Sequence, residues 1–131
     1  MVHIERTKEW WNKEKSSYDL FMSDFVVEEL NEGSYPYKDL TTTLLSEVTI
    51  LEPNKIIQEI VDVYIKNTLM PSSDIRDAIH LAYTSYYKIN FLLTWNCSHL
   101  ANVNKKEHIR NINKRLGIFV PEIVTPLELR I

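Results

Sequence analysis

Short apolar runs that suit β-strands alternate with longer amphipathic runs that suit helices along most of this chain. The strand-like runs are rich in β-branched and aromatic residues, and they span residues 18–24, 48–53, 91–95 and 122–126. Apolar residues recur at helical spacing over residues 3–17, 24–33, 54–70, 74–88 and 105–117, and less clearly over residues 36–47. Strands that alternate with helices predict an α/β domain with a mostly parallel sheet and right-handed crossovers.

The length of the chain, 131 residues, is enough for one domain with a hydrophobic core and too short for two. Its one cysteine, Cys97, excludes an intrachain disulfide and fits a reducing compartment. The sequence has no apolar run long enough to cross a membrane and no signal-peptide stretch near residue 1. We therefore expect a single cytoplasmic domain over residues 1–131, without membrane contact.

The charge of the chain is unevenly placed. A net charge of −3 gives no overall attraction to nucleic acid, so such binding would need a local basic patch. The predicted helix over residues 105–117 carries basic side chains, which are Lys105, Lys106, His108, Arg110, Lys114 and Arg115. A charged helix of this kind is usually a solvated face, although it can also contact phosphates.

Two carboxylates fall close to the apolar faces of predicted helices. Glu29 lies about 40° from Phe25 on a helical wheel, inside the apolar arc, whereas Glu28 lies outside it. Asp77 lies about 40° from Leu81, on the shoulder of a wide apolar face. Because burying a lone charge is costly, such a carboxylate has to be paired, protonated or metal-bound. Two alternatives stay open: Glu29 as a half-exposed residue at the edge of the arc, and Asp77 as an acid that stabilises the first helical turn.

The predicted strand over residues 91–95 ends in several polar residues, which are Asn96, Cys97, His99 and Asn102. Asn at such a place is most often a turn residue or a helix cap, and Cys97 with His99 lacks the further ligands of a zinc site. In parallel sheets, however, ligands bind beyond the carboxyl ends of the strands. Glu29, Asp77 and Asn96 can converge at one such edge, where oxygen ligands without thiols suit Mg²⁺ or Mn²⁺.

Four blocks of the chain are more specific in their order and spacing than any one of them is alone. They read "YDLFMSDFVVEELNEG", "SSDIRDAIHLA", "FLLTWNCSHLAN" and "GIFVPEIVTPLEL". Together they resemble the PIN-domain proteins, and in particular the VapC-type toxins of bacterial toxin–antitoxin pairs. The resemblance covers nearly the whole chain. It implies a compact three-layer α/β/α fold, metal-dependent cleavage of RNA, a homodimer and a cognate antitoxin protein as partner.

The resemblance also assigns the site. Glu29 matches the family's acid on the helix after its second strand, and Asp77 matches the acid that opens "DAIHLA". Asn96 stands where many members place an acid after the fourth strand. The resemblance implies that all three are catalytic and metal-binding, with Glu29 and Asp77 as anionic ligands of Mg²⁺ or Mn²⁺ and Asn96 orienting a metal-bound water. Because an amide replaces a carboxylate, we expect weak metal binding and low activity.

The family's first strand, which ends in an acid followed by a small hydroxyl residue, has no counterpart here. The chain starts at "MVHIERTKEWW", which resembles the segment after that strand. The strand is central in the family's sheet, so its absence leaves a gap between residues 18–22 and 91–95. We expect these two strands to pair directly, or a segment of another chain to fill the gap. We also expect exposed Trp10 and Trp11 to favour a homodimer. The alternative function is a catalytically silent PIN-like module that binds an antitoxin-like partner or itself.

Overall fold

The computed structural model describes residues 9–11, 13, 18–32, 45–67, 75–94, 103–125 and 128. In chain order its elements are β1 (Phe21–Ser23), α2 (Asp24–Glu32), the 3₁₀ helix η2 (Leu45–Glu47), β2 (Thr49–Leu51), α4 (Lys55–Lys66), α5 (Ile75–Tyr86), β3 (Phe91–Leu93), α6 (Val103–Leu116) and β4 (Glu122–Val124). Residues 9–11 and 13 are also helical. The fold is therefore mixed α/β, as predicted, although each strand is shorter than predicted. Most of the weaker helix expected over residues 36–47 lies outside the described residues, and its end forms η2.

Two helices begin where polar side chains accept hydrogen bonds from their first turns. The Ser23 hydroxyl accepts from the Val26 N–H at 3.2 Å and caps α2. The Asn54 side chain accepts from the Ile57 N–H at 3.0 Å and caps α4 in the same way. Each cap satisfies one of the backbone donors that the first turn of a helix leaves unpaired.

The described strands form two separate sheets of two strands each, and both pairs are parallel. β1 pairs with β2, in a register that sets Phe21 opposite Thr49. β3 pairs with β4, in a register that sets Leu92 opposite Ile123. The parallel direction of the strands is thus confirmed. The expected direct pairing of the strand at residues 18–22 with the strand at 91–95 is wrong, because β1 and β3 belong to different sheets.

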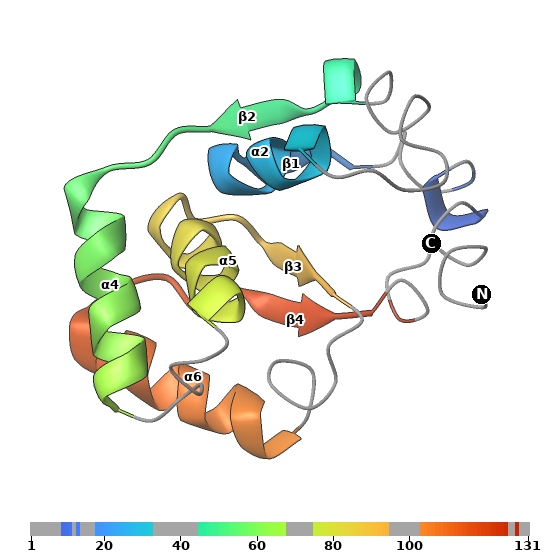
Figure 1. The fold of residues 1–131 in the computed structure, drawn as a ribbon. Coiled ribbons are helices and arrows are strands. Elements are labelled where there is room, and N and C mark those ends of the chain that lie inside the picture. The colour runs from blue at the N-terminus through green and yellow to red at the C-terminus, as the bar shows by residue number, and fades with distance from the viewer. Residues whose placement is uncertain are drawn as a thin grey trace.

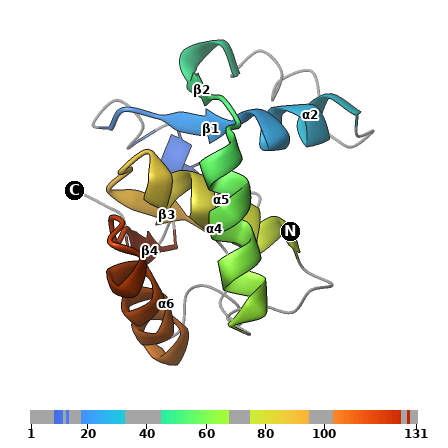
Figure 2. The same cartoon turned by 90° about the vertical axis from the view of Figure 1, so that its left-hand side faces the viewer.

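The hydrophobic core lies almost entirely in one part of the molecule. Its buried side chains come from α4, α5, α6 and β4, and they are Ile57, Ile60, Val61, Tyr64, Ala78, Leu81, Ala82, Tyr83, Ile109, Ile112 and Ile123. Figures 1 and 2 show these elements grouped with β3 below, and β1, α2 and β2 grouped above. We call the first group the main body and the second the N-terminal lobe. Among the described residues of the lobe, Leu51 reaches the core cluster, and it is partly buried there.

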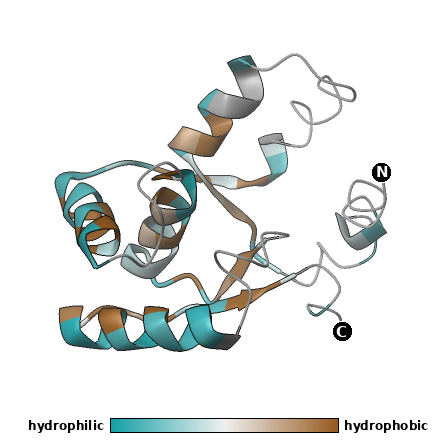
Figure 3. Ribbon diagram, turned by 60° about the horizontal axis from the view of Figure 1, so that its bottom comes forward, coloured by the Kyte–Doolittle hydropathy of each residue, from teal (hydrophilic) through white to brown (hydrophobic). Residues whose placement is uncertain are grey.

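α4 and α6 each bury one face, as their apolar spacing predicts, whereas the consecutive residues Leu81–Ser85 of α5 are all buried. In α4 the buried residues are Ile57, Ile60, Val61 and Tyr64. Hydrophilic residues dominate α6 in Figure 3, and its apolar residues Ile109 and Ile112 are buried against the other helices. No helix within the described ranges is both long enough and apolar enough to cross a membrane.

Candidate active site

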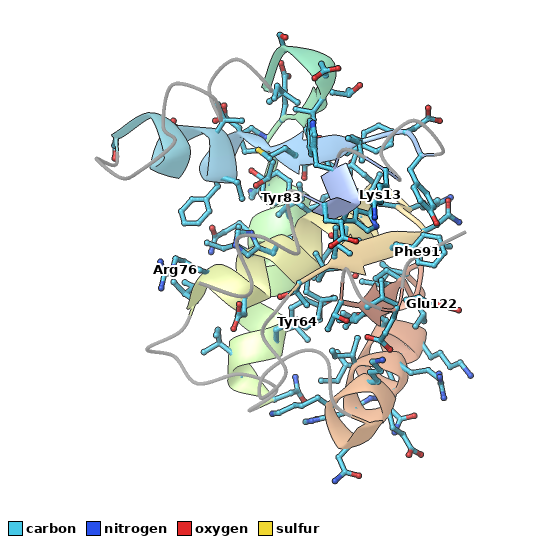
Figure 4. The ribbon with its side chains drawn as sticks, turned by 90° about the vertical axis from the view of Figure 1, so that its right-hand side faces the viewer. Lys13, Tyr64, Arg76, Tyr83, Phe91 and Glu122 are labelled. Atoms are coloured by element: carbon cyan, nitrogen blue, oxygen red, sulfur yellow. The ribbon has the colours of Figure 1, made fainter. Side chains whose placement is uncertain are left out.

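Asp77 is the one predicted site residue whose side chain the structure describes. It lies in the first turn of α5 and is buried, with 8% of its surface exposed. Its neighbour Arg76 and the first residue of β3, Phe91, lie on opposite sides of the molecule in Figure 4. The start of α5 therefore lies away from the start of β3.

The start of α2 lies beside the start of α5. The ring of Phe25, in the first turn of α2, lies 6.0 Å from the ring of His80, one turn after Asp77. Because α2 begins directly after β1, this contact brings the carboxyl end of β1 to the same place. The first turns of α2 and α5 thus lie beside the carboxyl end of β1, and in parallel sheets ligands bind at such ends.

Two acids of α2, Asp24 and Glu28, act electrostatically on Tyr83 of α5, and neither is among the predicted site residues. Burial raises the pKa of Tyr83 on α5, and the charges of Asp24, Tyr87 and Glu28 raise this pKa further. Asp24 and Glu28 are four residues apart, so they share one side of the helix. That spacing is readable in the sequence, but a site predicted from the apolar arc of the helix leaves out Glu28, which lies outside the arc. Glu28 is indeed exposed, although its charge still contributes to the raised pKa of Tyr83.

Glu29 and Asn96 cannot be placed beside Asp77. The backbone of Glu29 belongs to α2, but its side chain lies outside what the structure describes, as does the whole of Asn96. The convergence of the three residues therefore stays a prediction. It would require the carboxylates of Glu29 and Asp77 to lie within about 8 Å, a span that one or two hydrated metal ions can bridge.

The described side chains do not form a metal site by themselves. No group of three His, Cys, Asp or Glu residues within the described ranges is arranged to hold a metal ion. Mg²⁺ is usually held by one or two carboxylates and keeps several of its waters. Asp77, as a buried carboxylate, has the right chemistry for one ligand. A magnesium or manganese site would need Glu29 or Asn96 as well.

Aromatic rings connect the lobe and the main body at the other ends of the strands. Trp10 stacks on Tyr18 with ring centroids 5.8 Å apart, and Tyr18 meets Phe91 edge-on at 6.3 Å. Trp10 is only 4% exposed, so the expectation that it forms exposed apolar surface is wrong. The ring contacts with Tyr18 explain this, because they place the indole against the start of β1. β1 and β3 are thus linked at their starts by side chains and not by a strand ladder.

A buried polar network lies apart from this region, and sequence reasoning missed it. The Tyr64 hydroxyl donates to Asn113 Oδ1 at 2.7 Å and lies 3.2 Å from Ser85 Oγ. The Asn113 amide donates to Ser85 Oγ and to the Phe119 carbonyl, each at 2.9 Å. Burial raises the pKa of Tyr64 to about 12, against the opposing effect of its two hydrogen bonds. The network joins α4, α5 and α6 and has no group that titrates near neutral pH, so its role is structural.

Comparison of the chain with protein-family models, with curated proteins and with solved structures finds no match in any of the three. The functional argument therefore depends on the residues themselves.

Proposed function

We propose that this chain is a PIN-like, metal-dependent endoribonuclease with the three-layer α/β/α arrangement, acting in the cytoplasm as the toxin of a toxin–antitoxin pair. One observation carries the proposal: the Asp77 carboxylate is buried in the first turn of α5, which lies beside the carboxyl end of β1. A buried acid beside the carboxyl end of a parallel strand lies where such sheets bind ligands, which fits a functional role.

In this proposal Asp77 and Glu29 hold Mg²⁺ or Mn²⁺, and Asn96 orients a water beside them. The metal, when bound, lowers the pKa of a bound water and stabilises the charge that develops on the phosphate. The Phe25–His80 contact positions the first turn of α2, and therefore the backbone that carries Glu29, relative to α5. Asp24 and Glu28 add negative charge near Tyr83, which favours a cation on this side of the molecule.

The test is cleavage of a labelled single-stranded RNA by the purified chain, with Mn²⁺ and with EDTA. We expect slow cleavage that requires the metal. Asp77→Asn, which keeps the shape and removes the charge, should reduce the rate by about 100-fold or more, the scale on which one electrostatic contact to a transition state acts. Asp62→Asn, at an exposed acid on α4, is the matched control and should leave the rate unchanged. Equal rates for the wild type and Asp77→Asn would exclude the proposed site.

Asn96 offers a test in the opposite direction. Restoring a carboxylate with Asn96→Asp should tighten Mn²⁺ binding and raise the rate of cleavage, because charge helps to hold a hard cation. Isothermal titration with Mn²⁺ would measure the change. Weaker or unchanged Mn²⁺ affinity in Asn96→Asp would remove this residue from the site.

A second candidate function is a catalytically silent PIN-like module that pairs with an antitoxin-like protein or with itself. The observation that favours it is the split sheet: among the described strands, β1 pairs with β2 alone and β3 with β4 alone. Open strand edges accept strands from other chains. Sedimentation equilibrium at micromolar concentration would test the expected homodimer. A chain that forms dimers and cleaves no RNA would favour this candidate over the nuclease.

A further inference from the structure

Positive charge is concentrated on α6. The helix holds five cations, Lys105, Lys106, Arg110, Lys114 and Arg115, and one acid, Glu107, for a net charge of +4. The whole chain carries −3, so the rest of the sequence carries −7. Lysine and arginine in the last turn also stabilise a helix through its dipole. That effect accounts for Lys114 and Arg115 but not for the cations in earlier turns.

The inner side of α6 fixes the direction of its charged side. Ile109 and Ile112 are each 1% exposed, and Asn113 is fully buried in the network with Tyr64 and Ser85. The helix is therefore held against α4 and α5 by both apolar contact and hydrogen bonds. Its rotation about its own axis is set, and the charged residues of the other side are held in a fixed arrangement on the surface.

The outer side presents its cations in a row. Lys106, Arg110 and Lys114 recur every four residues, so they form one ridge with steps of about 6 Å along the helix. Arg110, Lys114 and Arg115 are exposed, and Lys106 is half-buried. The charge of Lys106 also helps, after a backbone hydrogen bond at Thr125, to lower the pKa of Glu128. The three exposed cations are therefore the better ones to test.

The composition of this face distinguishes between two kinds of acidic partner. Protein interfaces are anchored by large apolar and aromatic side chains, whereas nucleic-acid interfaces are more polar and much more positively charged. Leu116, at the end of α6, is the one large apolar residue among the exposed positions described on this helix. Exposed Asn104 and Asn111 lie among the cations, and such amides commonly bond phosphate and sugar oxygens.

We propose that the exposed face of α6 binds the phosphate backbone of single-stranded RNA, with Arg110, Lys114 and Arg115 as phosphate contacts and Lys106 beside them. The choice of RNA as the nucleic acid rests on the proposed ribonuclease function, whereas the phosphate contact does not. The face reads no base sequence, because contacts to phosphates position a strand and do not specify it.

The experiment measures binding of a fluorescent oligouridylate of about 20 nucleotides by anisotropy, in EDTA, between about 50 and 200 mM salt. In EDTA no metal-dependent cleavage interferes. For four phosphate contacts on a single strand, log K should fall against log salt with a slope of about −3. The triple variant Arg110→Gln/Lys114→Gln/Arg115→Gln should lose about 2 of that slope and bind at least about tenfold more weakly at low salt. Glutamine keeps the helix propensity close to that of the replaced residues.

A matched control removes the same charge elsewhere. Lys55, Lys66 and Lys88 are exposed and lie outside α6, so Lys55→Gln/Lys66→Gln/Lys88→Gln should keep the wild-type affinity and slope. An equal loss in both triple variants, or no binding by the wild type, would overturn the proposal. A polyglutamate of matched charge that binds as tightly as RNA, with the same loss in the α6 variant, would instead assign the face to acidic proteins. Asp77→Asn separates this proposal from the proposed function: it should reduce the rate of cleavage by about 100-fold or more and leave the binding slope unchanged.

Discussion

The main body and the N-terminal lobe are built from the same kinds of element, yet they differ in what holds them together. Three helices and β4 of the main body share one buried cluster, and the Tyr64–Ser85–Asn113 network crosses it. The lobe has a capped helix and one strand pair, but Phe21 and Ile50 on its two strands are 42% and 40% exposed. Isolated pairs of strands are marginal in water. The comparison indicates that stability lies in the main body and that the proposed metal edge lies where the weaker lobe meets it.

The largest effect should come from the centre of the main body. Leu81 is fully buried, so Leu81→Ala should lower the free energy of unfolding by about 2 to 5 kcal/mol through lost burial and a cavity. Met22, half-buried on β1, is the matched position in the lobe, and Met22→Ala should cost about 1 kcal/mol or less. Urea unfolding would measure both. Similar costs for the two variants would show that the lobe and the body are equally well packed.

The second-largest effect on the free energy of unfolding should appear at alkaline pH and come from Tyr64. Its pKa is raised from 10.0 to about 12 in the folded chain. A raised pKa favours the neutral form on folding, so this contribution is fully present below about pH 10 and is lost as the pH rises through about 12. Two pKa units correspond to about 3 kcal/mol. Tyr64→Phe should be about 1 to 2 kcal/mol less stable near neutral pH, because Asn113 loses a donor, and should lack this part of the alkaline loss.

Urea unfolding of the wild type and Tyr64→Phe at several pH values between about 8 and 12 gives the difference directly, because the other titrating groups cancel. The gap between the two proteins should narrow, or change sign, with rising pH. A constant gap would show that the hydroxyl is not held neutral by burial.

Leu81 and Tyr64 also differ in how far their surroundings could be predicted from the sequence. Helical spacing found α4, α5 and α6, and with them Leu81 and the rest of the core, because amphipathic periodicity is a local property. The Tyr64–Asn113 bond joins residues 49 positions apart, and nothing local marks Asn113 as buried. The Ser23 cap of α2, in contrast, joins residues three positions apart, so it is a local feature.

The sheet and the candidate site show the same division. Each strand was predicted, but which strands pair depends on long-range contacts, and the expected single sheet is instead two pairs among the described strands. Asp77 is buried, as its place on the helical wheel predicts, whereas its role in a site stays a prediction. Asp24 and Glu28 were missed because their effect on Tyr83 arises only when α2 lies against α5.

A third prediction uses the two helix caps as a matched pair. Asn54→Ala and Ser23→Ala each remove a cap worth about 1 kcal/mol. Asn54 caps α4 in the main body, so its loss should lower the global free energy of unfolding by that amount. Ser23 caps α2, so its loss should speed hydrogen exchange at the amides of α2 and leave the global value nearly unchanged, if the lobe opens separately. Equal global losses would mean that lobe and body unfold as one unit.

The smallest effect on stability, and the sharpest on association, is expected at Phe21. This residue lies on β1 opposite Thr49, with 42% of its surface exposed, and large apolar side chains on open strand edges favour pairing between chains. Phe21→Thr keeps a residue that suits a strand and should change the free energy of unfolding by no more than about 0.5 kcal/mol. If a second copy completes the lobe, the same change should weaken the homodimer in sedimentation equilibrium.

Ile56→Thr is the control. Ile56 is 51% exposed on α4 in the main body, so its replacement should leave association unchanged. Equal weakening by both changes would mean that the chains associate non-specifically through exposed apolar side chains. No weakening by either change would mean that the lobe is stable with its strand edge open.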